Sequence, residues 1–223
     1  MIIVHHLNNS RSQRVLWLLE ELGVAYSVKR YERDPLTLLA PSALREVHPL
    51  GKSPVIVDGA STVAETGAII EYLIGRHGNG RLIPPVDSAQ RQRYSYWLHY
   101  AEGSLMPLLV MRLVFERVKI SPMPFFAKPV ARGISNRVDR MMISPQLAIH
   151  LDFLEAELSG TDWFAGSEFS AADVQMSFPV EAARAFGAVD GKRPRLADWL
   201  LRIHSRPAYA RALVAGGPYT LSS

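Results

Sequence analysis

The chain of 223 residues contains no cysteine. This absence excludes disulfide bonds, zinc sites built on thiolates, dithiol redox chemistry and a catalytic cysteine. Any sulfur chemistry carried out by the protein therefore needs a sulfur atom that a ligand supplies. The seven histidines form no i,i+4 pair of the kind that binds metal ions, so we expect no metal site.

Long apolar runs, blocks of like charge and low-complexity segments are also missing. The longest apolar stretch, residues 105–115, is short for a bilayer and contains Pro107 and Arg112, so no membrane span is expected. The first residues do not read as a secretory signal, and we predict a cytoplasmic protein. The net charge of +4 suits anionic small molecules but is too small to predict nucleic-acid binding.

The first 81 residues alternate between strand and helix patterns. Apolar residues at helical spacing end at Gly23, and Asp58 followed by Gly59 predicts the turn of a hairpin. The predicted elements are a strand at residues 2–7, a helix over 15–22, a strand at 26–31, a strand from 54, its hairpin partner at 62–63 and a helix from 65. This βαβ-ββα order predicts an α+β domain over residues 1–81.

The composition changes after that point. Residues 82–87 form a proline-rich linker, and residues 88–223 read as an all-α helical bundle. We expect a long helix from Ala89 to Lys119, bent at Pro107. Further helices are predicted to carry Leu147, Leu151, Leu154 and Leu158, and to begin at Ser170, Pro194 and Pro207.

The helix predicted at Ser170 carries the strongest local signal in the second half. Ser170 and Asp173 fit a capping box, with Phe169 and Val174 at the positions of a hydrophobic staple. These polar atoms would be used on the unpaired N–H groups of a helix start. We therefore expect a structural role for this pair.

Ser10 follows the first strand and precedes the first helix, where N–H groups converge and the helix dipole favours an anion. A thiol has a pKa of about 8.5, and lowering it by about two units takes roughly 2.7 kcal/mol. A hydroxyl donor at a helix N-terminus can supply that. Taken alone, Ser10 is better interpreted as an N-cap than as a catalytic residue. Arg11 and Arg14 either add positive charge here or pair with an acidic neighbour such as Glu20 or Glu21.

Two further segments have polar residues suited to binding. In residues 48–55, Pro54 at the start of a strand is a candidate cis proline, while the Gly51-Lys52-Ser53 triplet lacks the upstream glycine and following helix of a phosphate loop. Glu65 and Thr66 begin a helix, a pairing suited either to capping it or to gripping the ammonium and carboxylate of an amino acid.

Four segments, taken together and in order, resemble the cytosolic glutathione transferase family, especially its bacterial and fungal members with a serine-type first loop. They are SRSQRVLW at residues 10–17, HPLGKSPV at 48–55, ETGAIIEYL at 65–73 and WFAGSEFSAAD at 163–173. The similarity covers essentially the whole chain. It implies a thioredoxin-like N-terminal domain, an all-α C-terminal domain and a homodimer.

The resemblance also assigns expected roles. Ser10 aligns with the serine that activates the thiol, with Asn9 and Ser12 as competitors, and Arg11 lies beside it. Lys52 corresponds to the residue that meets the glycine carboxylate, and Ser53, before a cis Pro54, to the backbone that pairs with the cysteinyl unit. Glu65 and Thr66 correspond to the pair that binds the ammonium and carboxylate of the γ-glutamyl end.

An electrophile pocket is expected where the long helix faces the first domain, because ligand sites favour domain interfaces. Its candidate residues are Tyr96, Tyr100, Ser104, Leu105, Met111 and Phe115, whose spacing equally fits core packing.

The implied activity is conjugation of glutathione to hydrophobic electrophiles, as in detoxification, or peroxide reduction, with glutathione as co-substrate and no cofactor. A non-catalytic binding module with the same fold is the alternative. A thiol-disulfide oxidoreductase is disfavoured by the missing cysteines.

Overall fold

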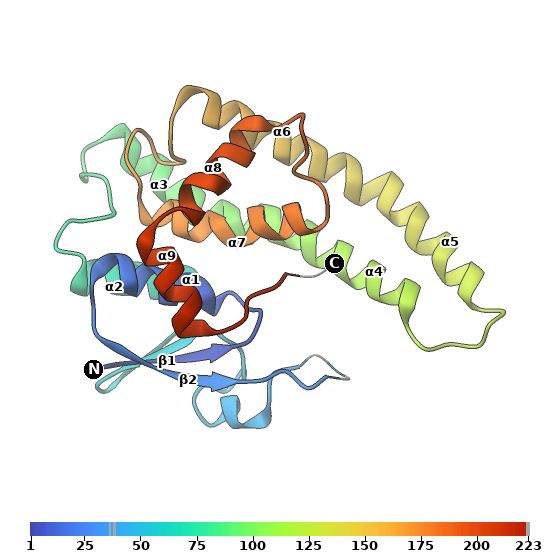
Figure 1. Ribbon diagram of the computed structural model, residues 1–223, viewed down its shortest axis with the longest axis horizontal. Helices are drawn as coiled ribbons and strands as arrows, with labels where there is room; N and C mark the ends of the chain where they lie inside the picture. The colour runs from blue at the N-terminus through green and yellow to red at the C-terminus, as the bar shows by residue number, and fades with distance from the viewer. Residues whose placement is uncertain (36, 38, 222–223) are drawn as a thin grey trace.

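The computed structural model describes residues 1–35, 37 and 39–221. Its N-terminal part contains a four-stranded sheet of order β2-β1-β3-β4 (Figure 1). β1 (Ile2–Leu7) runs parallel to β2 (Tyr26–Tyr31) and antiparallel to β3 (Val55–Asp58), which pairs with β4 (Ser61–Ala64). The predicted strands and hairpin are confirmed.

Two helices pack with this sheet, α1 (Ser12–Leu22) and α2 (Thr66–His77), and a short 3₁₀ helix spans Ser42–Arg45. α1 buries most of its residues because it lies between the sheet and the helical half of the chain. It ends at Gly23, whose φ of 66° is readily adopted only by a residue without a side chain. The βαβ-ββα prediction is therefore confirmed.

The second part is helical throughout, as predicted. Its elements are α3 (Ala89–Tyr100), α4 (Met106–Ile120), α5 (Lys128–Val138), α6 (Ser144–Gly160), α7 (Ala171–Ala185), α8 (Pro194–His204) and α9 (Pro207–Gly216). The predicted linker falls in the connection between α2 and α3. Among the described residues, no helix combines the length and apolar character needed to cross a bilayer.

Prolines explain two irregular turns inside the long helices. π-helical turns at Ala101–Leu105 and Asp139–Ile143 join α3 to α4 and α5 to α6, and each precedes a proline, Pro107 or Pro145. A proline ring cannot donate to the carbonyl four residues earlier and collides with it, so the helix widens there. The predicted bend near Pro107 is thus found as a widened turn just before it.

One hydrophobic core runs through both halves of the protein. The Trp17 ring of α1 lies 5.5 Å from Phe169 and 5.1 Å from Tyr209, which belong to the helical half. The Arg206 guanidinium lies 3.7 Å from the Phe169 ring, and Arg206 also pairs with Glu21. Side chains from either half can therefore be held rigidly at a shared site.

The capping box at the start of α7 is present. Ser170 Oγ accepts from Ala172 N at 3.3 Å, and the Asp173 carboxylate accepts from Ser170 N and Phe164 N, both at 3.0 Å. Trp199 Nε1 donates to the same carboxylate at 3.1 Å. Asp173 is fully buried, and burial raises its pKa to about 6 despite these donors. These contacts agree with the predicted structural role of Asp173 at the helix start.

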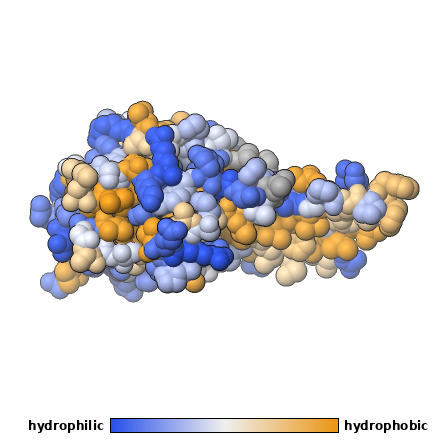
Figure 2. All heavy atoms as spheres, turned by 90° about the horizontal axis from the view of Figure 1, so that it is seen from below, coloured by the Kyte–Doolittle hydropathy of each residue, from blue (hydrophilic) through white to orange (hydrophobic). Residues whose placement is uncertain are grey.

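The ends of α4 and α5 form an arm that extends away from the rest of the molecule (Figure 1). Hydrophobic side chains spread along this arm (Figure 2), where Ile120, Phe125 and Phe126 are 73%, 84% and 69% exposed. A shallow apolar cleft lies between the two helices, lined by Val118, Met123, Phe126, Ala127, Val130, Ala131 and Ile134. The arm therefore presents a large apolar surface.

Candidate functional site

A cavity of about 280 Å³ lies where the first loop, β3 and α2 meet the helical half. It brings together six of the residues predicted from the sequence to bind glutathione and adds others. The lining residues are Arg11, His48, Leu50, Lys52, Ser53, Pro54, Ala64, Glu65, Thr66 and Glu102. The segments around residues 10, 50 and 65, distant in sequence, thus converge on one site.

Lys52 and Glu65 put opposite charges on the wall of the cavity. Both side chains are exposed, and neither forms a hydrogen bond or ion pair with any residue that the structure describes. Lys52 follows a tight turn in which Gly51 N donates to His48 O at 2.8 Å with a Gly51 φ of 57°. The cavity therefore offers one free ammonium and one free carboxylate to a zwitterionic ligand.

Ser53 and Pro54 form the floor between these charges, and the peptide bond joining them is cis, as predicted. The Ser53 hydroxyl donates to His5 O at 2.9 Å and accepts from Leu7 N at 3.2 Å. These contacts tie the side chain to β1. Because the hydroxyl is occupied in this way, only the Ser53 backbone remains to meet a ligand.

The N-terminus of α2 opens on the cavity. No side chain in the described part of the chain caps it, so Glu65 does not act as a cap. Glu65 instead has a φ of 69°, an uncommon backbone conformation for a residue with a side chain. Thr66 is 4% exposed and accepts from Arg14 Nη2 at 3.3 Å through Oγ1. The unpaired N–H groups of this helix start favour a bound anion.

Glu102 is the site residue that sequence reasoning missed. It comes from the π-helical turn after α3 and accepts from Arg11 Nε at 3.0 Å and Arg14 Nη2 at 2.5 Å. Burial would raise the pKa of Glu102, but the two guanidinium charges hold it below its usual value. The signal was present in the sequence, because Glu102 interrupts an apolar helix face with Leu98 and Leu105.

Glu102 therefore takes the place of the partners expected for Arg11 and Arg14. Of the two alternatives, pairing with a carboxylate is found, but the partner is not Glu20 or Glu21, since Glu20 bonds Arg211 and Glu21 bonds Arg206. Those carboxylates lie in the second half of α1 and face α9. The first-turn arginines are thus turned toward the cavity end of α1.

Ser10 lies beside this cavity but is not one of its lining residues, and it is 4% exposed. Its Oγ accepts from Ser12 N at 3.2 Å and lies 2.7 Å from Ser12 Oγ. It therefore makes a capping contact at the start of α1, one of the two roles that the sequence left open.

Ser12 is fully buried, and its hydroxyl lies 2.8 Å from His6 Nδ1 and 3.3 Å from Leu7 O. Burial and the nearby Arg30 charge lower the pKa of His6 to about 4, so the ring is neutral at pH 7. The Ser12 hydroxyl is therefore held inside the protein and does not line the cavity. It is a hydrogen-bonding partner of Ser10.

Asn9 is the third residue predicted in the first loop. It has a φ of 48°, and its Oδ1 accepts from Thr220 N at 2.8 Å. Tyr219, the next residue back, donates its hydroxyl to Glu181 of α7 at 2.7 Å. Asn9 therefore holds the C-terminal segment beside the first loop, and its side-chain oxygen is already used.

The residues predicted for the electrophile pocket do not converge on the cavity. Tyr100 is buried, and its hydroxyl oxygen lies 2.5 Å from His150 Nδ1. Tyr96 stacks on Tyr100 and packs edge-on against Phe153. Both tyrosines therefore lie on the side of α3 that faces α6.

The other members of that set are also outside the cavity lining. Leu105 is completely buried in the core, Met111 is exposed on α4, and Ser104 and Phe115 are half-buried. The electrophile pocket expected from these residues is separate from the cavity described above and stays a prediction.

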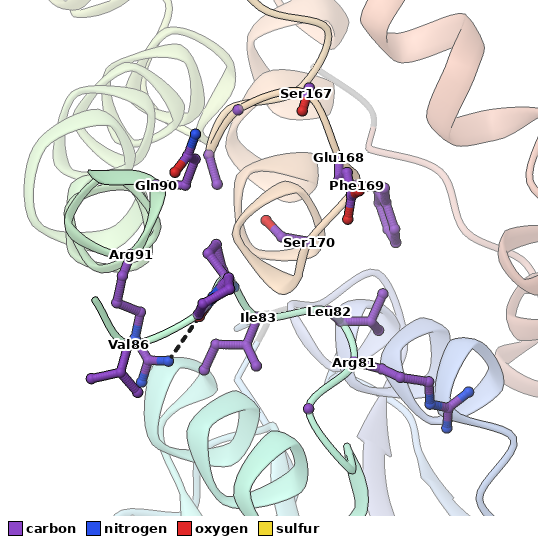
Figure 3. Close-up of a pocket in the computed structure, with 15 residues that line it drawn as sticks. Arg81, Leu82, Ile83, Val86, Gln90, Arg91, Ser167, Glu168, Phe169 and Ser170 are labelled. Atoms are coloured by element: carbon purple, nitrogen blue, oxygen red, sulfur yellow. Dashed lines mark hydrogen bonds between the residues drawn. The ribbon is translucent and has the colours of Figure 1, made fainter. Parts of the chain in front are cut away.

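A larger cavity, of about 820 Å³, lies elsewhere, between the linker and the loop before α7 (Figure 3). Arg91 points along the linker and donates to Pro84 O at 3.2 Å, while Ser167 and Glu168 line the opposite side (Figure 3). None of the predicted glutathione-binding residues lines it. Its size alone therefore gives no reason to prefer it as the site.

Comparison with known proteins matches both halves of the chain. Residues 10–75 match the glutathione S-transferase N-terminal domain, and residues 139–207 match the glutathione S-transferase C-terminal domain. Glutathione S-transferase 3 of Schizosaccharomyces pombe is 36% identical over 208 residues, covering 93% of this chain and 85% of that protein. Glutathione S-transferase 1 of Saccharomyces cerevisiae is 34% identical over 219 residues, covering 94% and 93%.

A solved structure agrees with these matches. The crystal structure of a glutathione S-transferase from Actinobacillus pleuropneumoniae has a TM-score of 0.78 and 31% identity, covering 99% of this chain and 95% of that chain. Sequence motifs, domain matches and overall structure therefore agree. The chain belongs to the glutathione S-transferase family and is a transferase of that family.

Proposed function

We propose that the enzyme binds reduced glutathione in the cavity between Lys52 and Glu65, stabilises its thiolate and transfers it to electrophilic small molecules. One observation carries the proposal. A free ammonium, a free carboxylate and an uncapped helix N-terminus line one cavity, and glutathione carries two carboxylates and one ammonium that complement them.

In this binding mode the tripeptide lies along the cis Ser53–Pro54 floor. Its glycine carboxylate meets Lys52, its cysteinyl unit pairs with the Ser53 backbone, and its γ-glutamyl ammonium meets Glu65. The γ-glutamyl carboxylate lies at the start of α2, against Thr66 and the free N–H groups. Glu102 is not a rival for the ammonium, because both of its oxygens already accept from arginines.

Ser10 is the proposed activator of the thiol. Its hydroxyl hydrogen turns from Ser12 Oγ toward the sulfur, the sulfhydryl proton passes to water, and the thiolate is held at the start of α1. Arg11, which lines the cavity next to Ser10, adds positive charge. The thiolate then attacks the electrophilic carbon; with an aryl halide, a C–S bond forms and halide leaves.

We also propose that the enzyme is a homodimer. The exposed apolar arm of α4 and α5 supports this, because contiguous apolar surfaces of that extent usually mark an interface. A dimer mass by light scattering is expected at micromolar concentration. A monomer at that concentration would contradict the assembly without affecting the binding site.

The catalytic proposal is tested by the ultraviolet absorbance of the thiolate, followed against pH in the glutathione complex. The bound thiol should have a pKa well below the ordinary value of about 8.5, and Ser10→Ala should move it back up and slow conjugation of an aryl halide. Ser135→Ala, which alters a buried hydroxyl far along α5, serves as the matched control. Full thiolate formation in Ser10→Ala would remove Ser10 from the mechanism.

A further inference from the structure

The Thr66 hydroxyl can only be an acceptor toward Arg14, because a guanidinium donates and cannot accept. Its own hydrogen therefore points elsewhere. No acceptor among the described residues takes this hydrogen. Since Thr66 lines the cavity, the direction left for its hydroxyl to donate is toward a ligand.

Arg14 is held firmly while it makes this contact. Its side chain is 1% exposed, Nη1 donates to Gln175 O of α7 at 2.5 Å, and Nη2 donates to Glu102. The ring of Phe178 lies 5.4 Å from the guanidinium carbon. Because groups on separate helices fix the guanidinium, its orientation toward Thr66 does not depend on a ligand.

We infer that Arg14 is a positioning residue for the γ-glutamyl carboxylate of glutathione. By occupying a lone pair of Thr66 Oγ1, it orients the hydroxyl so that the hydrogen is presented to the carboxylate. A hydrogen bond from a cation also polarises the hydroxyl and makes it a stronger donor. Arg14 itself does not line the cavity. The inference rests on the proposed function, since it refines how that site binds its ligand.

A role limited to neutralising Glu102 would not need the contact with Thr66. Arg11 already donates to both oxygens of Glu102, at 3.2 and 3.0 Å. A purely structural Arg14 would also affect every ligand of the cavity to the same extent. The positioning role is different, because it concerns one carboxylate of the ligand and disappears when that carboxylate is absent.

The test uses two ligands, glutathione and 4-aminobutyryl-cysteinyl-glycine, which lacks only the γ-glutamyl carboxylate. Calorimetry gives the ratio of their Kd values for each enzyme variant. Arg14→Lys, which keeps the charge but shortens the reach, should lower the preference for glutathione about tenfold, as should Thr66→Val. The double variant Arg14→Lys/Thr66→Val should show the same preference for glutathione as Thr66→Val alone. Thr66→Ser should keep the preference of the wild type.

A second variant, Arg14→Met combined with Glu102→Gln, is used if Arg14→Lys does not fold, because removing both members of a buried ion pair costs less than removing one. Its ratio should match that of Thr66→Val. If either variant weakened the binding of both ligands to the same extent, the inference would be overturned, while the proposed function would still stand. Failure of the wild type to bind glutathione would instead overturn the proposed function.

Discussion

Helices α2 and α7 begin with the same kinds of side chain, a carboxylate and a hydroxyl, but use them differently. At α7, Ser170 and Asp173 accept hydrogen bonds from the protein itself, and Asp173 is completely buried. At α2, the Glu65 carboxylate accepts none from the described residues and Thr66 faces a cavity. The residue types are similar, and what differs is where their hydrogen-bond partners come from.

The start of α7 stabilises the fold, whereas the start of α2 is available to bind a ligand. A carboxylate whose donors are all internal stabilises the fold, and its loss leaves those donors unpaired. A free carboxylate next to a free helix start contributes little to folding and is available to a ligand.

The largest expected effect is on stability. Asp173→Ala should lower the free energy of unfolding by about 3 kcal/mol or more, because it leaves buried N–H groups of Phe164, Ser170 and Trp199 unsatisfied. Glu65→Ala should change it by less than about 0.5 kcal/mol. Urea unfolding of both variants checks this, and equal losses would show that the two helix starts are not different in kind.

The pH dependence of stability sharpens the same contrast. Burial raises the pKa of Asp173 to about 6, above its unfolded value of about 3.8. The native state therefore holds the proton more tightly, and the stability that protonation gives is lost as pH rises from about 4 to about 6, by up to about 3 kcal/mol. Urea unfolding at several pH values should show this slope for wild type relative to Asp173→Asn. An opposite slope would mean that the hydrogen bonds outweigh burial.

A smaller effect is expected on binding. Glu65→Gln should weaken glutathione by about 1.5 kcal/mol, close to tenfold, because it removes the charge that meets the ammonium. Glu168→Gln is the matched control, since Glu168 is an exposed carboxylate that lines the other cavity. Calorimetric Kd values for both variants decide the matter. Similar Kd values would argue against an ammonium contact at Glu65.

The smallest expected effect has opposite signs for stability and binding. Glu65 has a φ of 69°, which glycine tolerates and other residues avoid. Glu65→Gly should raise the free energy of unfolding by up to about 1 kcal/mol while weakening glutathione binding like Glu65→Gln. Thermal unfolding together with calorimetry measures the two changes. Lower stability in Glu65→Gly would mean that the wild-type backbone is not strained there.

The sequence predicted the fold well because its signals are local. Gly23 ends α1 in a left-handed conformation, and the turn at Asp58 and Gly59 joins β3 to β4. The capping box at Ser170 and Asp173 likewise uses residues three apart. Each of these devices acts within a few residues, so it can be recognised without knowledge of the rest of the structure.

The site was harder to predict because its contacts are long-range. Glu102 stands out locally as a charge on an apolar helix face, but no local pattern says that it meets Arg11 and Arg14 about 90 positions away in the sequence. The stripe through Tyr96 and Tyr100 satisfies helical spacing, but spacing alone does not say which neighbour the stripe faces. Packing against α6, through Phe153 and His150, decides that.

The central claim is that the open start of α2, with Lys52 and Glu65 beside it, binds glutathione. Calorimetric titration of reduced glutathione into the wild type and Lys52→Ala, at two temperatures, tests it most directly. We predict saturable binding to the wild type at one site per chain, weakened by about 1.5 to 3 kcal/mol in Lys52→Ala through loss of a charge-assisted contact. Absence of binding to the wild type, or equal affinity in the two proteins, would contradict the claim.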